Sequence, residues 1–286
     1  MTIGVTGATG QLGRLVVAKL KEKVPAAGIV ALVRSPEKAR DLGIAARKAD
    51  YTDPATLGSA LAGIDTLLLI SSNDMAGDRA AHHINVIEAA RAAGVKRIVY
   101  TSLLHADTST LSLAEDHRRT EAALKASGVS YTILRNGWYH ENNLAALGGA
   151  LASGTFIGAT GDGRISGATR LDFAEAAVAV LAGAGHEGKV YELAGDTAWT
   201  MTDLAAEVSR QSGKQIGYSD LGEAGYAAAL AQYGMAEAMA AAIASWDAAT
   251  ASGALFDDQR QLSALIGRPT TTLSVAVAEA LKGLAA

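Results

Sequence analysis

The chain has 286 residues, with 25 basic and 29 acidic side chains and a formal net charge of −4 at pH 7. This balance provides no overall positive field for nucleic acid, so no nucleic-acid partner is expected. The absence of cysteine excludes disulfides, thiolate catalysis and thiolate metal sites. No His-Glu-x-x-His motif is present either, and no bound metal is expected.

No apolar run approaches the roughly 20 residues that a membrane helix needs, so no membrane partner is expected. The N-terminus lacks the charged and apolar regions of a signal peptide. The expected location is therefore the cytoplasm.

A strand is expected at residues 3–6, and the glycine-rich segment TGATGQLG follows it at 6–13. Three glycines in this segment are spaced three apart: Gly7, Gly10 and Gly13. Apolar residues on one face predict a helix at 12–20 directly afterwards. Glycines on a strand-to-helix turn allow phosphates to approach backbone amides, so we expect a dinucleotide pyrophosphate loop. A tight turn without a ligand is the alternative.

Predicted strands and helices then alternate through the first half of the chain. Further strands are expected at 29–34, 45–50, 65–71, 97–102 and 131–136. Helices are expected after Pro36, after Asp53-Pro54, at 79–93 before Gly94 and at 112–127 before Gly128. Six strands separated by helices predict an α/β fold, with a Rossmann-type doubly wound parallel sheet.

The regular alternation of predicted strands and helices ends at about residue 148. The expected elements are a Gly-rich stretch at 154–167, helices at 172–182 and 202–212, a strand at 189–193, an Ala-rich helical region at 223–250 and a tail helix at 270–285. We predict an NADP-binding Rossmann domain at 1–148 and a smaller C-terminal α/β substrate lobe at 149–286. This boundary is approximate, because the chain can return to the sheet.

Polar side chains follow several of the predicted strands. Arg34 ends the second strand, where an arginine favours the 2′-phosphate of NADP over the ribose hydroxyl of NAD. Asp50 ends the third strand, where its carboxylate could accept from an adenine amino group or cap the next turn. Arg34 could equally be a solvated charge.

The fourth strand is followed by Ser71, Ser72 and Asn73, and the fifth ends at Thr101-Ser102. These residues could contact ribose or nicotinamide, or could simply form turns. The segment LRNGWYHENN at 134–143 follows the sixth strand and gathers aromatic and amide side chains. It is typical of a lining for a flat ligand, although a packed helix start is the alternative.

The proton-donating Tyr-x-x-x-Lys motif of short-chain dehydrogenases is missing, because none of the eight tyrosines has lysine four residues later. The corresponding helix carries His117, which could act as an acid–base group or could line the helix. The sequence assigns no catalytic residue.

The chain resembles the NAD(P)H:quinone oxidoreductase type 2 group of the NmrA-like, atypical short-chain dehydrogenase/reductases. The resemblance rests on Arg34 and on the segments TGATGQLG, LLLISS, YTSLLHADTS, LRNGWY and GHEGKVYELAGD. It covers nearly the whole chain, and YTSLLHADTS with LRNGWY separates it from the related triphenylmethane dye reductases.

The resemblance implies NADPH as hydride donor, with NADH weaker, a quinone as acceptor, no flavin and a cytoplasmic protein. The missing Tyr-x-x-x-Lys agrees with it. The cofactor-binding set is expected to be Gly7, Ala8, Thr9, Gly10, Gln11, Leu12, Gly13, Arg34, Asp50, Ser71, Ser72, Asn73, Asn136 and Gly137. Trp138 and Tyr139 are expected on the substrate side.

Two other functions stay open at this stage. An NmrA-like redox sensor would bind NADP(H) without turnover and would need no room beside the nicotinamide. A reductase of other flat electrophiles, such as dyes, would need the same aromatic slot. The oligomeric state is also open, with a homodimer as one option.

Overall fold

The computed structural model describes residues 1–285 and contains two compact units that interleave along the chain. Unit 1 comprises Met1–Asp107, Glu115–Asn136 and Arg170–Leu193, and unit 2 comprises Thr108–Ala114, Gly137–Thr169 and the residues from Ala194 onward. The division after residue 148 stays a prediction.

Unit 1 is built on a seven-stranded sheet in the order β3-β2-β1-β4-β5-β6-β8. Its strands are β1 (Ile3–Thr6), β2 (Ile29–Val33), β3 (Ala45–Lys48), β4 (Thr66–Leu69), β5 (Arg97–Leu103), β6 (Ser130–Asn136) and β8 (Val190–Leu193). All six neighbouring pairs are parallel. The predicted Rossmann-type sheet is confirmed, and the strand expected at 189–193 joins it as the seventh.

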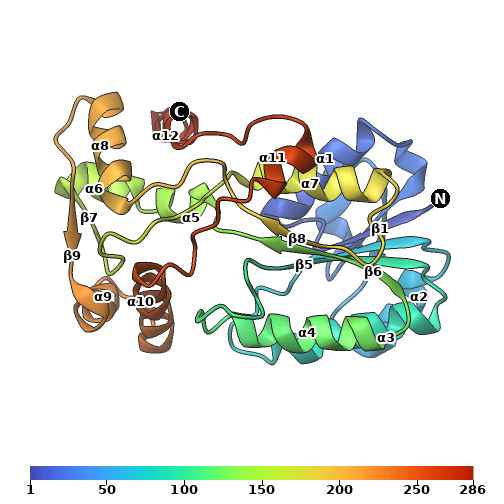
Figure 1. Cartoon of the computed structure of the whole chain (residues 1–286). Helices are drawn as coiled ribbons and strands as arrows, with labels where there is room; N and C mark the ends of the chain where they lie inside the picture. Colours follow the sequence, from blue (N-terminus) through green and yellow to red (C-terminus); the bar gives the residue numbers. More distant parts are fainter. Residues whose placement is uncertain (286) are drawn as a thin grey trace. The chain divides into compact units, whose positions relative to one another are not determined.

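Helices cover both faces of this sheet (Figure 1). They are α1 (Gln11–Lys21), α2 (Leu57–Leu61), α3 (Arg79–Ala92), α4 (Ala114–Ala126) and α7 (Arg170–Ala182), with 3-10 helices η1 (Ala26–Gly28), η2 (Pro36–Leu42) and η3 (Pro54–Thr56). α1 and α7 pack together on one face, and α2, α3 and α4 lie on the other. Gly94 and Gly128 follow α3 and α4 in the left-handed region, as expected for helix-ending glycines.

The core explains the apolar character of the central strands. Leu67, Leu68 and Leu69 of β4 are fully buried, as a strand covered on both faces requires. On the side of α2, α3 and α4, Leu67 and Leu69 join a cluster that includes Val86 and Leu124. This packing fixes the strand ends from which the polar residues project.

Unit 2 contains a two-stranded parallel sheet of β7 (Thr155–Gly158) and β9 (Gly217–Asp220). Its helices are α5 (His140–Leu144), α6 (Leu147–Ser153), α8 (Met201–Ser212), α9 (Gly222–Gln232), α10 (Glu237–Ala251), α11 (Gln261–Ile266) and α12 (Leu273–Ala285). The predicted Ala-rich helical region contains two helices, α9 and α10, with Gly234 in the left-handed region between them. Within residues 1–285, no helix has both the length and the apolarity to cross a bilayer.

Candidate nucleotide site

The strand order places a switch point between β1 and β4. β1 pairs with β2 on one side and with β4 on the other, so chain connections diverge at this position. Ligands of open α/β sheets bind beyond the carboxyl ends of the strands at such a point. The glycine loop follows β1, and Ser71 to Asn73 follow β4, so both predicted segments lie at this edge.

The glycine loop is a tight backbone turn that excludes side chains. Gly7 has φ +59°, a conformation that L side chains rarely adopt. A Cβ on Gly13 would collide with the carbonyl oxygen of Gly7 and would lie 2.7 Å from Cα of Ala8. Glycine at both positions therefore allows α1 to begin directly against the loop, which matches the role of glycines in pyrophosphate loops.

The N-terminus of α1 is open to an anion. Its N-cap, Gly10, supplies no side-chain hydrogen bond, and the first turn carries no acidic residue. The first amides of a helix lack partners within the helix, and the helix dipole favours negative charge there. Gly10 and Gln11 are exposed, whereas Ala8 and Leu12 are buried beneath the loop. This cradle fits a pyrophosphate group.

Arg14 is a loop-supporting residue that sequence reasoning did not single out. Its Nε donates to the carbonyl oxygen of Thr9 at 3.1 Å, and its guanidinium pairs with Asp41 at 2.5 Å. It also donates to the carbonyl oxygen of Lys38 at 3.3 Å. Arg14 thus ties the glycine loop to η2. The sequence signal is its position one turn into α1.

Arg34 and Asp50 lie at the ends of neighbouring strands. Arg34 directly follows β2 and is exposed. Asp50 accepts from the amide of Thr52 at 3.0 Å and from its hydroxyl at 2.8 Å. These bonds, with a further contribution from the charge of Arg34, lower the pKa of Asp50. Asp50 therefore caps its turn, and a contact with adenine stays a prediction.

The segment after β4 is held by side chains where the strand ladder ends. Three consecutive amides donate to buried side chains: Ile70 N to Thr6 Oγ1 (2.9 Å), Ser71 N to Thr101 Oγ1 (2.9 Å) and Ser72 N to His83 Nε2 (2.7 Å). Ser71 and Ser72 are half-buried, and Asn73 is exposed. Thr101 is thus a backbone support for this segment.

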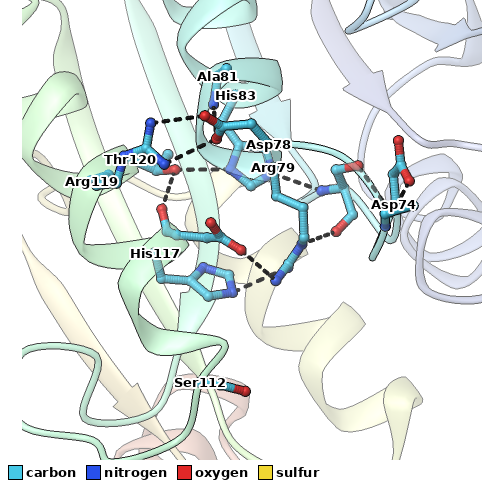
Figure 2. A network of polar contacts seen from close by, with 12 residues as sticks. Asp74, Asp78, Arg79, Ala81, His83, Ser112, His117, Arg119 and Thr120 are labelled. Atoms are coloured by element: carbon cyan, nitrogen blue, oxygen red, sulfur yellow. Dashed lines mark hydrogen bonds and ion pairs between the residues drawn. The ribbon is translucent and has the colours of Figure 1, made fainter. Parts of the chain in front are cut away.

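His83 of α3 and His117 of α4 belong to one buried polar network (Figure 2). The hydroxyl of Tyr100 lies 2.7 Å from His117 Nδ1 and 3.4 Å from His83 Nδ1. Arg79 lies against His117 Nε2 at 3.4 Å. Burial, followed by nearby positive charge, lowers the pKa of each histidine to about 3. His117 is therefore neutral near pH 7 and disfavoured as an acid–base group.

These two histidines predict acid sensitivity. Above about pH 7 neither the folded nor the unfolded chain protonates them, so they leave the free energy of unfolding unchanged. Below about pH 6.5 the unfolded chain binds protons that the folded chain accepts only near pH 3. The free energy of unfolding should therefore fall by up to about 1.4 kcal/mol per pH unit for each histidine.

Urea unfolding at neutral pH and at about pH 5, followed by circular dichroism, measures this effect. H117Q cannot titrate at this position and should show a shallower loss of stability with falling pH. Identical pH dependence in the variant and the parent would contradict the assignment.

The remaining predicted residues follow β6. Asn136 ends β6, is buried and accepts from the amide of Leu104 at 3.0 Å through its backbone carbonyl. Gly137 is also buried and opens the next stretch of unit 2. The structure therefore places Asn136 in unit 1 with the nucleotide loop and Gly137 in unit 2.

Trp138 and Tyr139 are half-buried in unit 2. The indole of Trp138 donates to Asn143 Oδ1 at 2.9 Å and lies edge-on to Trp246, with ring centroids 6.4 Å apart. Tyr139 forms a backbone bridge with Ala168. The aromatic pair with Trp246 is a feature that sequence spacing could not show, since 108 residues separate the two indoles.

Arg135 forms a buried ionic network at the ends of β5, β6 and β8. Its guanidinium donates twice to Glu121, at 2.9 and 2.8 Å, and once to Glu192 at 2.7 Å. It also pairs with Asp107 at 3.0 Å. Ser102 donates to the same Glu121 at 2.7 Å, so Ser102 is part of this network. Arg135 is thus a structural residue between three strands.

Sequence comparison supplies the family. The sequence model of the NAD(P)H-binding family matches residues 7–183. The chain belongs to this family. It is 58% identical over 278 residues to quinone oxidoreductase 2 of Escherichia coli K12, covering 96% of this chain and 97% of that protein. The predicted membership in the quinone oxidoreductase type 2 group is confirmed.

Solved structures agree with this placement. The crystal structure of the E. coli NADPH-dependent quinone oxidoreductase in complex with NADPH has a TM-score of 0.95 and 57% identity, over 98% of this chain and all of that chain. The Citrobacter triphenylmethane reductase complexed with NADP(H) has a TM-score of 0.93 and 37% identity, with 98% and 100% coverage. Both relatives are reductases that bind a nicotinamide cofactor.

Proposed function

We propose that this protein is an NADPH-dependent quinone reductase that works without flavin. The observation that carries the proposal is the 58% identity to quinone oxidoreductase 2 across almost the whole chain. The open α1 terminus and the glycine loop supply a cradle of the kind that dinucleotides require. The small-molecule substrate is then a quinone.

Each expected cofactor residue has a defined task. Gly7, Ala8, Thr9, Gly10, Gln11, Leu12 and Gly13 would hold the pyrophosphate, Arg34 the 2′-phosphate, Asp50 the adenine, and Ser71, Ser72, Asn73, Asn136 and Gly137 the nicotinamide half. When bound, NADPH supplies the hydride. Trp138 and Tyr139 would lie against the quinone.

The chain itself contributes binding and orientation rather than a strong acid. Tyr-x-x-x-Lys is absent, and the buried His117 is neutral, so neither provides a proton. After hydride transfer, the oxygen anion of the reduced quinone needs one proton, which water can supply. Holding two reactants in the correct geometry accounts for a large part of the rate of such a reaction.

The direct test is the stoichiometry of the reaction under anaerobic conditions. One quinone should be converted to hydroquinone for each NADPH consumed, by protein free of flavin. NADPH binding without turnover on quinones or triphenylmethane dyes would favour the redox sensor instead. Turnover on dyes alone would favour the dye reductase, the function of the related Citrobacter enzyme.

Arg34 should set the preference for NADPH. An arginine–phosphate contact is charge-assisted, so R34A should weaken NADPH binding about tenfold or more while leaving NADH binding nearly unchanged. R91A removes an exposed arginine from the last turn of α3 and serves as the matched control. Equal losses of affinity for NADPH and NADH in R34A would contradict a contact between Arg34 and the 2′-phosphate. Fluorescence titration measures both affinities.

The cytoplasmic location and a homodimeric state belong to the same proposal. Size-exclusion chromatography with light scattering measures the oligomeric state, and fractionation of cells measures the location.

A further inference from the structure

The backbone of the segment that follows β4 is held by side chains from neighbouring elements. Ser72 is the last of its held residues, and both of its backbone polar groups bind side chains from α3. Its amide donates to His83 Nε2 at 2.7 Å, and its carbonyl oxygen accepts from Arg79 Nε at 2.8 Å. Two side chains of α3 therefore hold the backbone of Ser72.

The first two turns of α3 supply both side chains that contact Ser72. Arg79 and His83 are four residues apart, so they lie on the same face of α3 one turn from each other. Both side chains are buried, with 6% of Arg79 and none of His83 exposed. Asp78 caps the helix by accepting from the amide of Ala81 at 3.0 Å, and Arg119 of α4 pairs with Asp78.

Side chains of α4 contact both His83 and Arg79 (Figure 2). His83 Nε2 accepts from Ser72, so its proton is on Nδ1, which donates to Thr120 Oγ1 at 2.9 Å. Thr120 in turn donates to the carbonyl oxygen of Asp116 at 2.7 Å. This chain of donors leaves His83 Nε2 free to accept only while the ring is neutral, which its burial ensures.

α4 also fixes the arginine. The carboxylate of Asp116 pairs with the Arg79 guanidinium at 3.3 Å, and His117 Nε2 lies 3.4 Å from the same group. The Arg79 guanidinium has only donors, so His117 Nε2 must be the acceptor and the His117 proton lies on Nδ1, facing Tyr100. Two helices therefore orient one loop residue through side chains of fixed protonation.

We propose that His83 and Arg79 are positioning residues that set the place of Ser71–Asn73 against the nicotinamide half of NADPH. β4 opens the second mononucleotide half of the sheet, whereas the glycine loop and Arg34 belong to the first half. The contacts of Arg79 and His83 with Ser72 thus affect only the nicotinamide end of the cofactor. This inference rests on the proposed function.

The test compares two ligands that share one end. Adenosine 2′,5′-bisphosphate carries the adenine and the 2′-phosphate but lacks the nicotinamide half. H83L removes the acceptor for Ser72 at similar volume, and should weaken NADPH binding about tenfold while changing the bisphosphate affinity less than about twofold. H83Q, whose amide oxygen can replace Nε2 as an acceptor, should restore much of the NADPH affinity.

Two further variants separate positioning from folding. Y100F removes the hydroxyl that lies 2.7 Å from His117 Nδ1 and 3.4 Å from His83 Nδ1, but it keeps His83 Nε2 as the acceptor for Ser72, and should leave the ratio of the two affinities as in the parent. R79K keeps the charge but loses the Nε donor, and should show the same selective loss as H83L. If H83L does not fold, R79K replaces it in the test.

A selective loss of NADPH affinity in H83L or R79K, absent in Y100F, supports the inference. Equal losses for both ligands, or no loss, would overturn it and leave the proposed function intact. Failure of the parent protein to bind NADPH would overturn both.

Discussion

Replacing Arg135 with methionine should lower the free energy of unfolding by about 3–5 kcal/mol. Arg135 is 6% exposed and Glu121 is 3% exposed, so removal of the guanidinium leaves a carboxylate in the protein interior without its main partner. Burial alone would raise the pKa of Glu121, but the bonds from Arg135 and Ser102 and the nearby positive charges keep it below its ordinary value. The variant loses that compensation.

Urea unfolding followed by circular dichroism measures the loss. R119M is the matched control, because Arg119 pairs with Asp78 on the surface, where both side chains are about half exposed. Exposed pairs contribute about 0.2–1 kcal/mol, so R119M should cost little. The double variant R135M/E121L removes both charges of the main pair and should recover part of the loss. A change below about 1 kcal/mol in R135M would contradict a buried network.

Replacing Gly13 with alanine should raise the dissociation constant of NADPH by at least about tenfold. The new Cβ would overlap the Gly7 carbonyl oxygen and crowd Ala8, and both contacts are backbone atoms that no side-chain rotation can relieve. α1 must then shift from the loop, which displaces its N-terminal amides. Overpacking of this kind also costs about 1–3 kcal/mol of stability.

Gly58 provides the control for this substitution. It lies in α2, and a Cβ there meets no atom within 4 Å. G58A should therefore keep the parent affinity for NADPH and gain up to about 1 kcal/mol in stability, since alanine favours a helix over glycine. Isothermal titration calorimetry and urea unfolding measure the two quantities. Unchanged NADPH affinity in G13A would show that the loop is a packing turn without a ligand.

Local signals in the sequence were sufficient for much of the fold. The strand at 3–6, the glycine turn and the helix ends at Gly94 and Gly128 depend on neighbouring residues, and the structure confirms them. The order of the strands, and thus the switch point between β1 and β4, is seen only in the structure, because alternating strands and helices with right-handed crossovers are compatible with several strand orders. The split of the Ala-rich region was missed because alanine-rich sequence has no clear period there.

The supporting residues of the candidate site were harder to predict. Arg79, His83 and His117 come from two helices and meet only when α3 and α4 pack on one face of the sheet. The sequence left His117 open as an acid–base group or a helix-lining residue, and only its burial beside Arg79 shows a neutral ring. Contacts between residues that are distant in the sequence produce no recognisable spacing of residues in the sequence. The predicted roles of the ligand-binding residues stay predictions until a cofactor is bound.

The most direct test of the central claim is the steady-state oxidation of NADPH by flavin-free protein, with benzoquinones, naphthoquinones and triphenylmethane dyes as acceptors and NADH in parallel. We expect quinone-dependent turnover with a higher kcat/KM for NADPH than for NADH. Tight NADPH binding without turnover on any acceptor would contradict the reductase.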